Sequence, residues 1–322
     1  MGLYAERGRV SVTLIKRWWH YLLAVLAISV LALTLTARIR ASSMTAPTSW
    51  ASTPATSTTA LSPSTATTVP SPSMPAMAAS PSTEPPARPP ILTAWADPGK
   101  WQRVWSTDFA VAVPLGQFPG ALESQWGDYP NPWPDTATQR NYSVHGYYDP
   151  ATTTWISDGN LHLKMWRGTG SIHSAVVYPK VASDVRYGRF IEVARVSKVD
   201  SGYKSAHLLW PAGNAANEVD FPENEWTMSP SAYVHYGAGD ATINFDTDVR
   251  WNDWHTYEIR WQPGSLAFYV DGKQVGRTTR GVPDVNMCWI IQNESALEGP
   301  SAPVNSYAQL DISYVEYDKY VG

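Results

Sequence analysis

Residues 254–272 read WHTYEIRWQPGSLAFYVDG and contain two short segments, 255–261 and 266–272, with Pro263 and Gly264 between them and Asp271 and Gly272 at the end. In the first segment apolar and polar side chains largely alternate, which is the period of a β-strand with one buried face. Pro-Gly and Asp-Gly pairs favour tight turns. This stretch therefore predicts two short strands bounded by turns.

The same kind of segment recurs through the C-terminal two thirds of the chain, at residues 160–166, 188–196 and 309–317, and Asp158 with Gly159 marks another turn. No window there has a convincing helical period. Short strands without helices predict an all-β domain over residues 96–322, built as an antiparallel β-sandwich or barrel. In a sandwich, one sheet can be concave and form a cleft for a linear polymer.

The N-terminal segment has the pattern of a membrane signal-anchor. Residues 21–37 read YLLAVLAISVLALTLTA, without a charge, after a basic segment that contains Arg7, Arg9, Lys16 and Arg17. Seventeen residues just reach the length that spans a bilayer. Basic residues keep residues 1–20 in the cytoplasm. The alternative is a cleaved signal peptide. Under either interpretation the remainder is exported, and it is either anchored to the outer face of the membrane or secreted.

Residues 38–95 are rich in Ser, Thr, Ala and Pro, and from 41 to 90 the charged residues are Glu84 and Arg88. Such a segment buries too little apolar surface to offset the entropy of ordering it. We expect a disordered linker that holds the β domain away from the membrane.

Composition limits the partners of the protein. The formal net charge is −4, which predicts no basic surface for nucleic acid. The single cysteine, Cys288, excludes an internal disulfide. The chain has 16 Trp and 17 Tyr but 6 Phe, and rings with a polar edge suit a groove that stacks sugars. We expect a monomer.

Residues 217–225 read NEVDFPENE and place four carboxylates in nine residues. In a regular strand Glu218 and Asp220 share a face, and Glu223 points to the other. One extra residue, a β-bulge, would return Glu223 to the face of Glu218 and Asp220, and Pro222 suits a position that has lost its ladder hydrogen bond. The spacing therefore predicts three acids along one groove.

Three neighbouring acids fit glycoside cleavage. Retaining glycosidases use two carboxyl groups about 5 to 5.5 Å apart, one as nucleophile and one as acid and then base. Two ionised carboxylates at about 5 Å and a dielectric near 20 repel by roughly 3 kcal/mol, or about two pK units. That repulsion keeps one proton in the group near neutral pH.

The sequence EVDFPE resembles the Glu-x-Asp-x-x-Glu signature of glycoside hydrolase family 16, the laminarinase and β-glucanase family. Residues 187–196, 206–211, 234–237 and 254–272 are similar to family strands in the same order, so the resemblance covers roughly residues 100–320. It implies a concanavalin-like jelly roll with a sugar cleft. It also implies that Glu218 is the nucleophile, Asp220 its assistant and Glu223 the acid/base. Asn217, Phe221 and Pro222 depart from the usual family pattern, and so does the glycine-free stretch 289–295.

Five further residues are candidates for substrate binding. Trp210 and Trp226 flank the acids, and each is either a stacking platform or a core residue. His235 either binds a carboxylate or a sugar, or is structural. Gln292 and Glu294 alternate on a later strand and are candidates for the same cleft. No His or Cys spacing predicts a metal centre, and we expect no cofactor. The resemblance allows a structural Ca²⁺ without indicating its ligands.

These observations predict a retaining endo-acting β-glycoside hydrolase that acts on extracellular polysaccharide, with β-1,3- or mixed-linkage β-glucan as the expected substrate. A cell-envelope transglycosylase and a non-catalytic carbohydrate-binding module on the same fold are the alternatives. The module has no need for three acids at this spacing. The transglycosylase shares every catalytic residue, so the sequence does not separate it from the hydrolase.

Overall fold

The computed structural model describes residues 100–322, apart from 141–144, 212–216 and 298. The predicted cytoplasmic segment, anchor and linker lie outside the described residues. Among the residues that are described, no helix has the length and apolar character needed to span a membrane.

The regular secondary structure of the described residues is almost entirely β-strand, as predicted. Its strands are β1 Trp101–Thr107, β2 Trp126–Asp128, β3 Gly146–Tyr148, β4 Thr154–Ser157, β5 Asn160–Arg167, β6 Ile172–Pro179, β7 Gly188–Lys198, β8 Tyr203–Pro211, β9 Val219–Glu225, β10 Ser231–Tyr236, β11 Ala241–Asp246, β12 His255–Gln262, β13 Ser265–Val270, β14 Lys273–Thr278, β15 Met287–Ser295 and β16 Tyr307–Tyr320. The short helices α2 Thr136–Gln139 and α3 Pro150–Thr153 and the 3-10 turns η2 Gly120–Leu122 and η3 Lys180–Ala182 complete it. The sequence showed no periodicity for α2 and α3, because four residues make a single turn.

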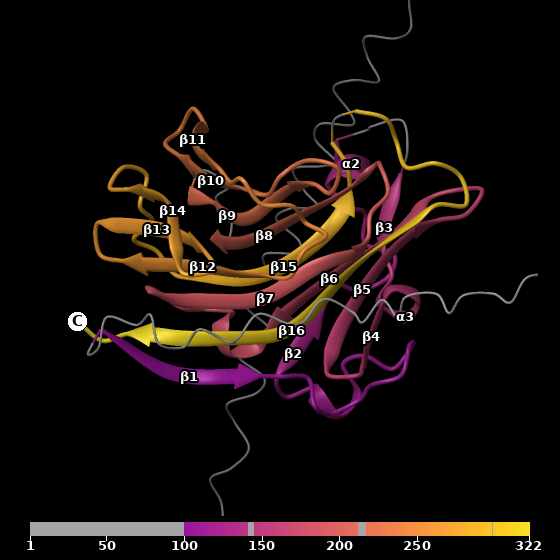
Figure 1. The fold of residues 1–322 in the computed structure, drawn as a ribbon, viewed down its shortest axis with the longest axis horizontal. Helices are drawn as coiled ribbons and strands as arrows, with labels where there is room; N and C mark the ends of the chain where they lie inside the picture. Colours follow the sequence, from indigo (N-terminus) through magenta and orange to yellow (C-terminus); the bar gives the residue numbers. More distant parts are fainter. Residues whose placement is uncertain (1–99, 141–144, 212–216, 298) are drawn as a thin grey trace, which may run out of the picture. The chain divides into compact units, whose positions relative to one another are not determined.

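The strands form two layers joined at one edge. One layer has the order β11-β10-β9-β8-β15-β6 and the other β5-β16-β7-β12-β13-β14. They connect where Trp166 of β5 pairs with His173 of β6. The pairs along this path are antiparallel, whereas β3 pairs with β6 in parallel. Figure 1 shows β8, β9 and β10 side by side in one layer. This is a β-sandwich, consistent with the expected jelly roll.

Two predicted turns have the backbone that their sequence requires. Asp158 and Gly159 have φ of 51° and 66°, and Asp271 and Gly272 have φ of 50° and 76°. Positive φ at both positions is the type I′ geometry, whose twist matches that of the strands it joins. These turns pair β4 with β5 and β13 with β14.

The main core lies between the layers. It takes alternate residues of β9 and β15, among them Val219, Phe221, Trp289 and Ile291, and packs them with residues such as Phe268 from the opposite layer. Alternation leaves the intervening residues of β8, β9 and β15 on the other face of the first layer. That face carries the acids.

Candidate active site

The predicted β-bulge is present in β9. Asp220 pairs with Tyr233 of β10, and Glu223 pairs with Ser231 of the same strand, so three steps on β9 match two on β10. On the other side, the same two acids pair with Leu208 and Ala206 of β8. The extra residue falls at Phe221 and Pro222, and it places Asp220 and Glu223 on one face.

Phe221, a residue of the bulge, packs into the core. This ring is 2% exposed and lies edge-on to Tyr257 and Phe268, with centroids 5.6 Å and 5.4 Å away. Tyr257 belongs to β12 and Phe268 to β13, in the opposite layer. Core packing therefore fixes one of the two residues between Asp220 and Glu223.

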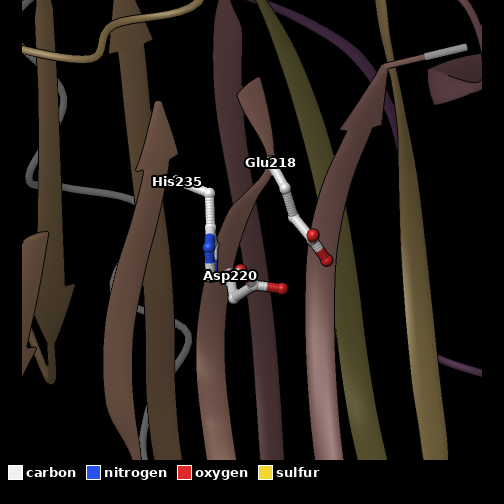
Figure 2. A group of neighbouring side chains, drawn as sticks. All are labelled: Glu218, Asp220 and His235. Atoms are coloured by element: carbon white, nitrogen blue, oxygen red, sulfur yellow. Dashed lines mark ion pairs between the residues drawn. The ribbon is translucent and has the colours of Figure 1, made fainter. Parts of the chain in front are cut away.

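Glu218, Asp220 and His235 lie together on that face (Figure 2). The side chains of Glu218 and Asp220 are hydrogen-bonded to each other. His235 extends from β10, where its backbone N–H donates to the Glu218 carbonyl at 2.9 Å. Its Nε2 lies 3.6 Å from Asp220 Oδ2, so the predicted neighbour of a carboxylate is there, at ion-pair rather than hydrogen-bond distance.

Burial controls the charge of this pair. It raises the pKa of Glu218 to about 7, against the lowering effect of His235 and the hydrogen bond with Asp220. Burial, and then the neighbouring charges of Glu218 and Glu223, raises the pKa of Asp220 well above its ordinary value. The two carboxyls therefore share a proton at neutral pH and titrate as a pair. The raised pKa values of Glu218 and Asp220 support the prediction that one proton stays in the group.

Glu223 forms an ion pair with a lysine, which was not predicted from the sequence. Lys204 of β8 places Nζ 2.7 Å from Glu223 Oε1 and 4.0 Å from Glu294 Oε1. A signal was available, because Lys204 is the one fully charged side chain in the strand YKSAHLLWP. A lysine in a strand with both faces covered requires a partner.

Gln292 and Glu294 belong to the same face, as predicted. Gln292 pairs with Ala206, which pairs with Glu223. Glu294 Oε2 accepts hydrogen bonds from the Thr136 backbone N–H at 3.0 Å and the Tyr148 hydroxyl at 3.1 Å. Burial raises the pKa of Glu294, and Lys204 opposes that shift. Glu294 thus provides a second carboxylate next to the Lys204 ammonium.

The two candidate tryptophans lie on opposite faces of the layer that carries the acids. Trp210 is half-buried and packs with Leu208 and Ile290 on the face that carries the acids. Trp226 is 2% exposed, belongs to the main core and donates from Nε1 to Ser205 Oγ at 2.8 Å. The prediction of a stacking role for Trp226 is wrong, because the strand ends at Glu225 and the next residue turns inward.

Another aromatic pair was missed because it lies in a loop without periodicity. Tyr129 stacks on Trp133, with ring centroids 5.5 Å apart, and Trp133 is 40% exposed. Tyr129 also contacts Tyr148, which binds Glu294. This pair is a candidate sugar platform on the far side of Glu294.

Glu218, Asp220 and His235 are also a group of possible metal ligands in the described residues, with donor atoms within 4.8 Å of one another. Calcium takes six to eight oxygen ligands. Two carboxylates that share a proton, with one imidazole, do not supply that set, so a structural Ca²⁺ remains a prediction without ligands.

A sheet face that gathers several carboxyl groups has the kind of side chains that carboxylate-dependent glycoside hydrolases use. Residues 141–290 match the model of Glycosyl hydrolases family 16. The resemblance predicted from the sequence is thereby confirmed, because the match lies within the β domain.

Curated relatives are glucanases. The chain is 23% identical to glucan endo-1,3-beta-glucosidase A1 of Niallia circulans, over 61% of this chain and 34% of the relative. It is 26% identical to a beta-glucanase of Acetivibrio thermocellus, over 50% of this chain and 47% of the relative. The chain thus spans about a third to a half of the length of these relatives.

Solved structures share the fold. The laminarinase from Rhodothermus marinus aligns with a TM-score of 0.56 at 22% identity, over 69% of this chain and 98% of that one. SCLam, a non-specific endo-beta-1,3(4)-glucanase from family GH16, aligns with a TM-score of 0.56 at 16% identity, over 70% of this chain and 94% of that one. At these identities the likeness concerns the fold alone.

Proposed function

We propose that this protein is a retaining endo-β-glycoside hydrolase that acts on β-1,3- or mixed-linkage β-glucan. The observation that carries the proposal is the bulge in β9, which puts Asp220 and Glu223 on one face with Glu218. The family match and the glucanase names of the relatives support the substrate class.

In the proposed mechanism Glu218, when ionised, attacks the anomeric carbon of the sugar. Protonated Glu223 gives its proton to the leaving oxygen as that bond breaks. The ionised Glu223 then takes a proton from water, which attacks the same carbon and releases Glu218. Two displacements retain the configuration of the anomeric carbon. Asp220 stabilises Glu218 through their hydrogen bond, and its proton offsets the charge repulsion between the acids.

The site also contains groups suited to holding a sugar chain. Trp210 and the exposed ring of Trp133 offer flat apolar faces, and sugar C–H groups pack on such faces. Gln292 supplies a half-buried amide on the same face of the sheet, two strands from Glu223. These residues are the proposed substrate-binding set, together with His235 and Glu294.

A panel of β-1,3-, β-1,4- and mixed-linkage glucans tests the proposal through release of reducing ends. Glu218→Gln should lose activity by several orders of magnitude and still bind glucan. Glu123→Gln, an exposed glutamate at the 3-10 turn η2, is the matched control. Proton NMR of the first product should show the β anomer. Full activity in Glu218→Gln, or an α product, would refute the mechanism, and products longer than the substrate would identify a transglycosylase.

We further propose that residues 21–37 anchor the enzyme in the membrane and that 38–95 tether it on the outer face. The uncharged apolar run and its basic flank support this. Expression of the full chain should place the β domain in the membrane fraction, open to external protease. A mature chain that begins after residue 37 would instead show a cleaved signal peptide.

A further inference from the structure

Lys204 lies at the centre of the charged groups on the acid face. It is 8% exposed. In the strand register it stands opposite Glu225 of β9 and opposite Glu294 of β15, and its ammonium turns to Glu223 at 2.7 Å. Burial lowers the pKa of Lys204, but the charges of Glu223 and then Glu294 together outweigh this effect, so the pKa is raised. Lys204 is therefore a cation at neutral pH.

Titratable groups on the neighbouring strands surround the ion pair of Lys204 and Glu223. They are Glu218, which immediately precedes β9, Asp220 and Glu225 of β9, Tyr233 of β10, Glu294 of β15, Tyr148 of β3, and, beyond them, His235, Asp135 and Asp246. Most are acids, so their charges favour protonation of Glu223. Lys204 opposes them at the shortest distance.

A proton on Glu223 must compete with this ion pair. A carboxylate 2.7 Å from an ammonium is stabilised in its charged form, and little water screens the pair because the Glu223 side chain is 17% exposed and that of Lys204 10%. Proton donation to the leaving oxygen needs the neutral form of Glu223. The contact therefore opposes the first chemical step and favours the second, in which Glu223 is a base.

We propose that Lys204 is a positioning residue that holds Glu223 as the ionised partner of an ion pair, and so limits the fraction of enzyme able to protonate the leaving group at alkaline pH. This inference rests on the proposed role of Glu223 as acid/base. Lys204 contacts no reacting atom and acts through Glu223.

The test compares kcat/KM from pH 5 to 9 on a soluble β-glucan for the wild type, Lys204→Met, Lys204→Gln and Lys204→Arg. Above the titration range of both glutamates, kcat/KM follows the protonated fraction of Glu223, and below it the ionised fraction of Glu218. The ratio of Lys204→Met to wild-type kcat/KM should therefore be about tenfold or more larger at pH 9 than at pH 5. Lys204→Arg keeps the charge, so its ratio should stay constant with pH.

A measurement without turnover keeps the two proposals separate. Carbon-13 NMR of the Glu223 carboxyl carbon, assigned by its loss in Glu223→Gln, should titrate at a higher pH in Lys204→Met than in the wild type. Wild-type protein that cleaves no glucan would refute the proposed function, and the NMR titration would still decide the role of Lys204.

Equal titration curves, or a kcat/KM ratio independent of pH in both neutral variants, would overturn the inference. Thermal unfolding establishes that each variant is folded. If neither neutral variant folds, Lys204 is a structural residue, and the inference is also overturned.

Discussion

Phe221 packs edge-on against Phe268, with ring centroids 5.4 Å apart and ring planes at 63°. Phe221 lies in the bulge between Asp220 and Glu223, and Phe268 lies on β13 in the other layer of the sandwich. The spacing of the acids is thus coupled to the packing of the core.

Phe221→Ala should destabilise the domain by about 3–5 kcal/mol, because it removes a fully buried ring and leaves a cavity. It should also lower kcat under folding conditions, since the bulge loses the contact that orients both acids. Urea denaturation and glucanase assays measure the two effects. Phe221→Leu, which keeps an apolar side chain, should lose less of each, and a stable Phe221→Ala enzyme with wild-type kcat would contradict this account.

The raised pKa of Glu218, about 7, predicts how the proposed nucleophilic attack depends on pH. Below that value Glu218 is mostly protonated and cannot attack. An activated 2-deoxy-2-fluoro glycoside with a dinitrophenolate leaving group needs no acid catalyst, so its rate of covalent labelling depends on Glu218 alone. That rate should fall about tenfold per pH unit below about pH 7. A labelling rate that does not change between pH 5 and pH 8 would show that the pKa of Glu218 is not raised.

Asp220→Asn should stabilise the domain at neutral pH while it lowers activity. The folded state raises the pKa of Asp220 above its unfolded value near 3.8, so the folded protein binds the proton more tightly. This contribution to stability is present below the unfolded value and is lost as the pH rises. Asparagine keeps the shape and a donor without the charge. Its Tm at pH 7 should exceed that of the wild type by about 2–4 °C, roughly 1 kcal/mol, with a smaller gain at pH 4. A Tm at pH 7 below that of the wild type would contradict the predicted gain in stability.

The two tryptophans give a matched pair of variants. Trp210→Ala should raise KM for glucan severalfold with little loss of stability, because the ring is half-buried on the acid face. Trp226→Ala should cost about 3–5 kcal/mol, because its indole is buried and holds Ser205. Denaturation and KM measurements on both variants separate the roles, and equal effects on KM would contradict the assignment.

The sequence by itself determined the strands, the turns and the acid spacing. The period of two predicted β5, β7, β12, β13 and β16 to within a few residues at each end. The spacing Glu-x-Asp-x-x-Glu, with a proline inside it, predicted the bulge, because two acids can share a strand face at that spacing only when one residue is added. These features are local, and neighbouring residues along the chain are enough to specify them.

The tertiary structure decided which side chains from different strands meet. It placed Lys204 against Glu223, turned Trp226 into the core and brought Tyr148 to Glu294. It also buried Glu218 and Asp220, and that burial raises the pKa of both carboxyls. The physical reason is that ion pairs and burial depend on strand order and register across the sheet, and the alternation within any one strand contains neither.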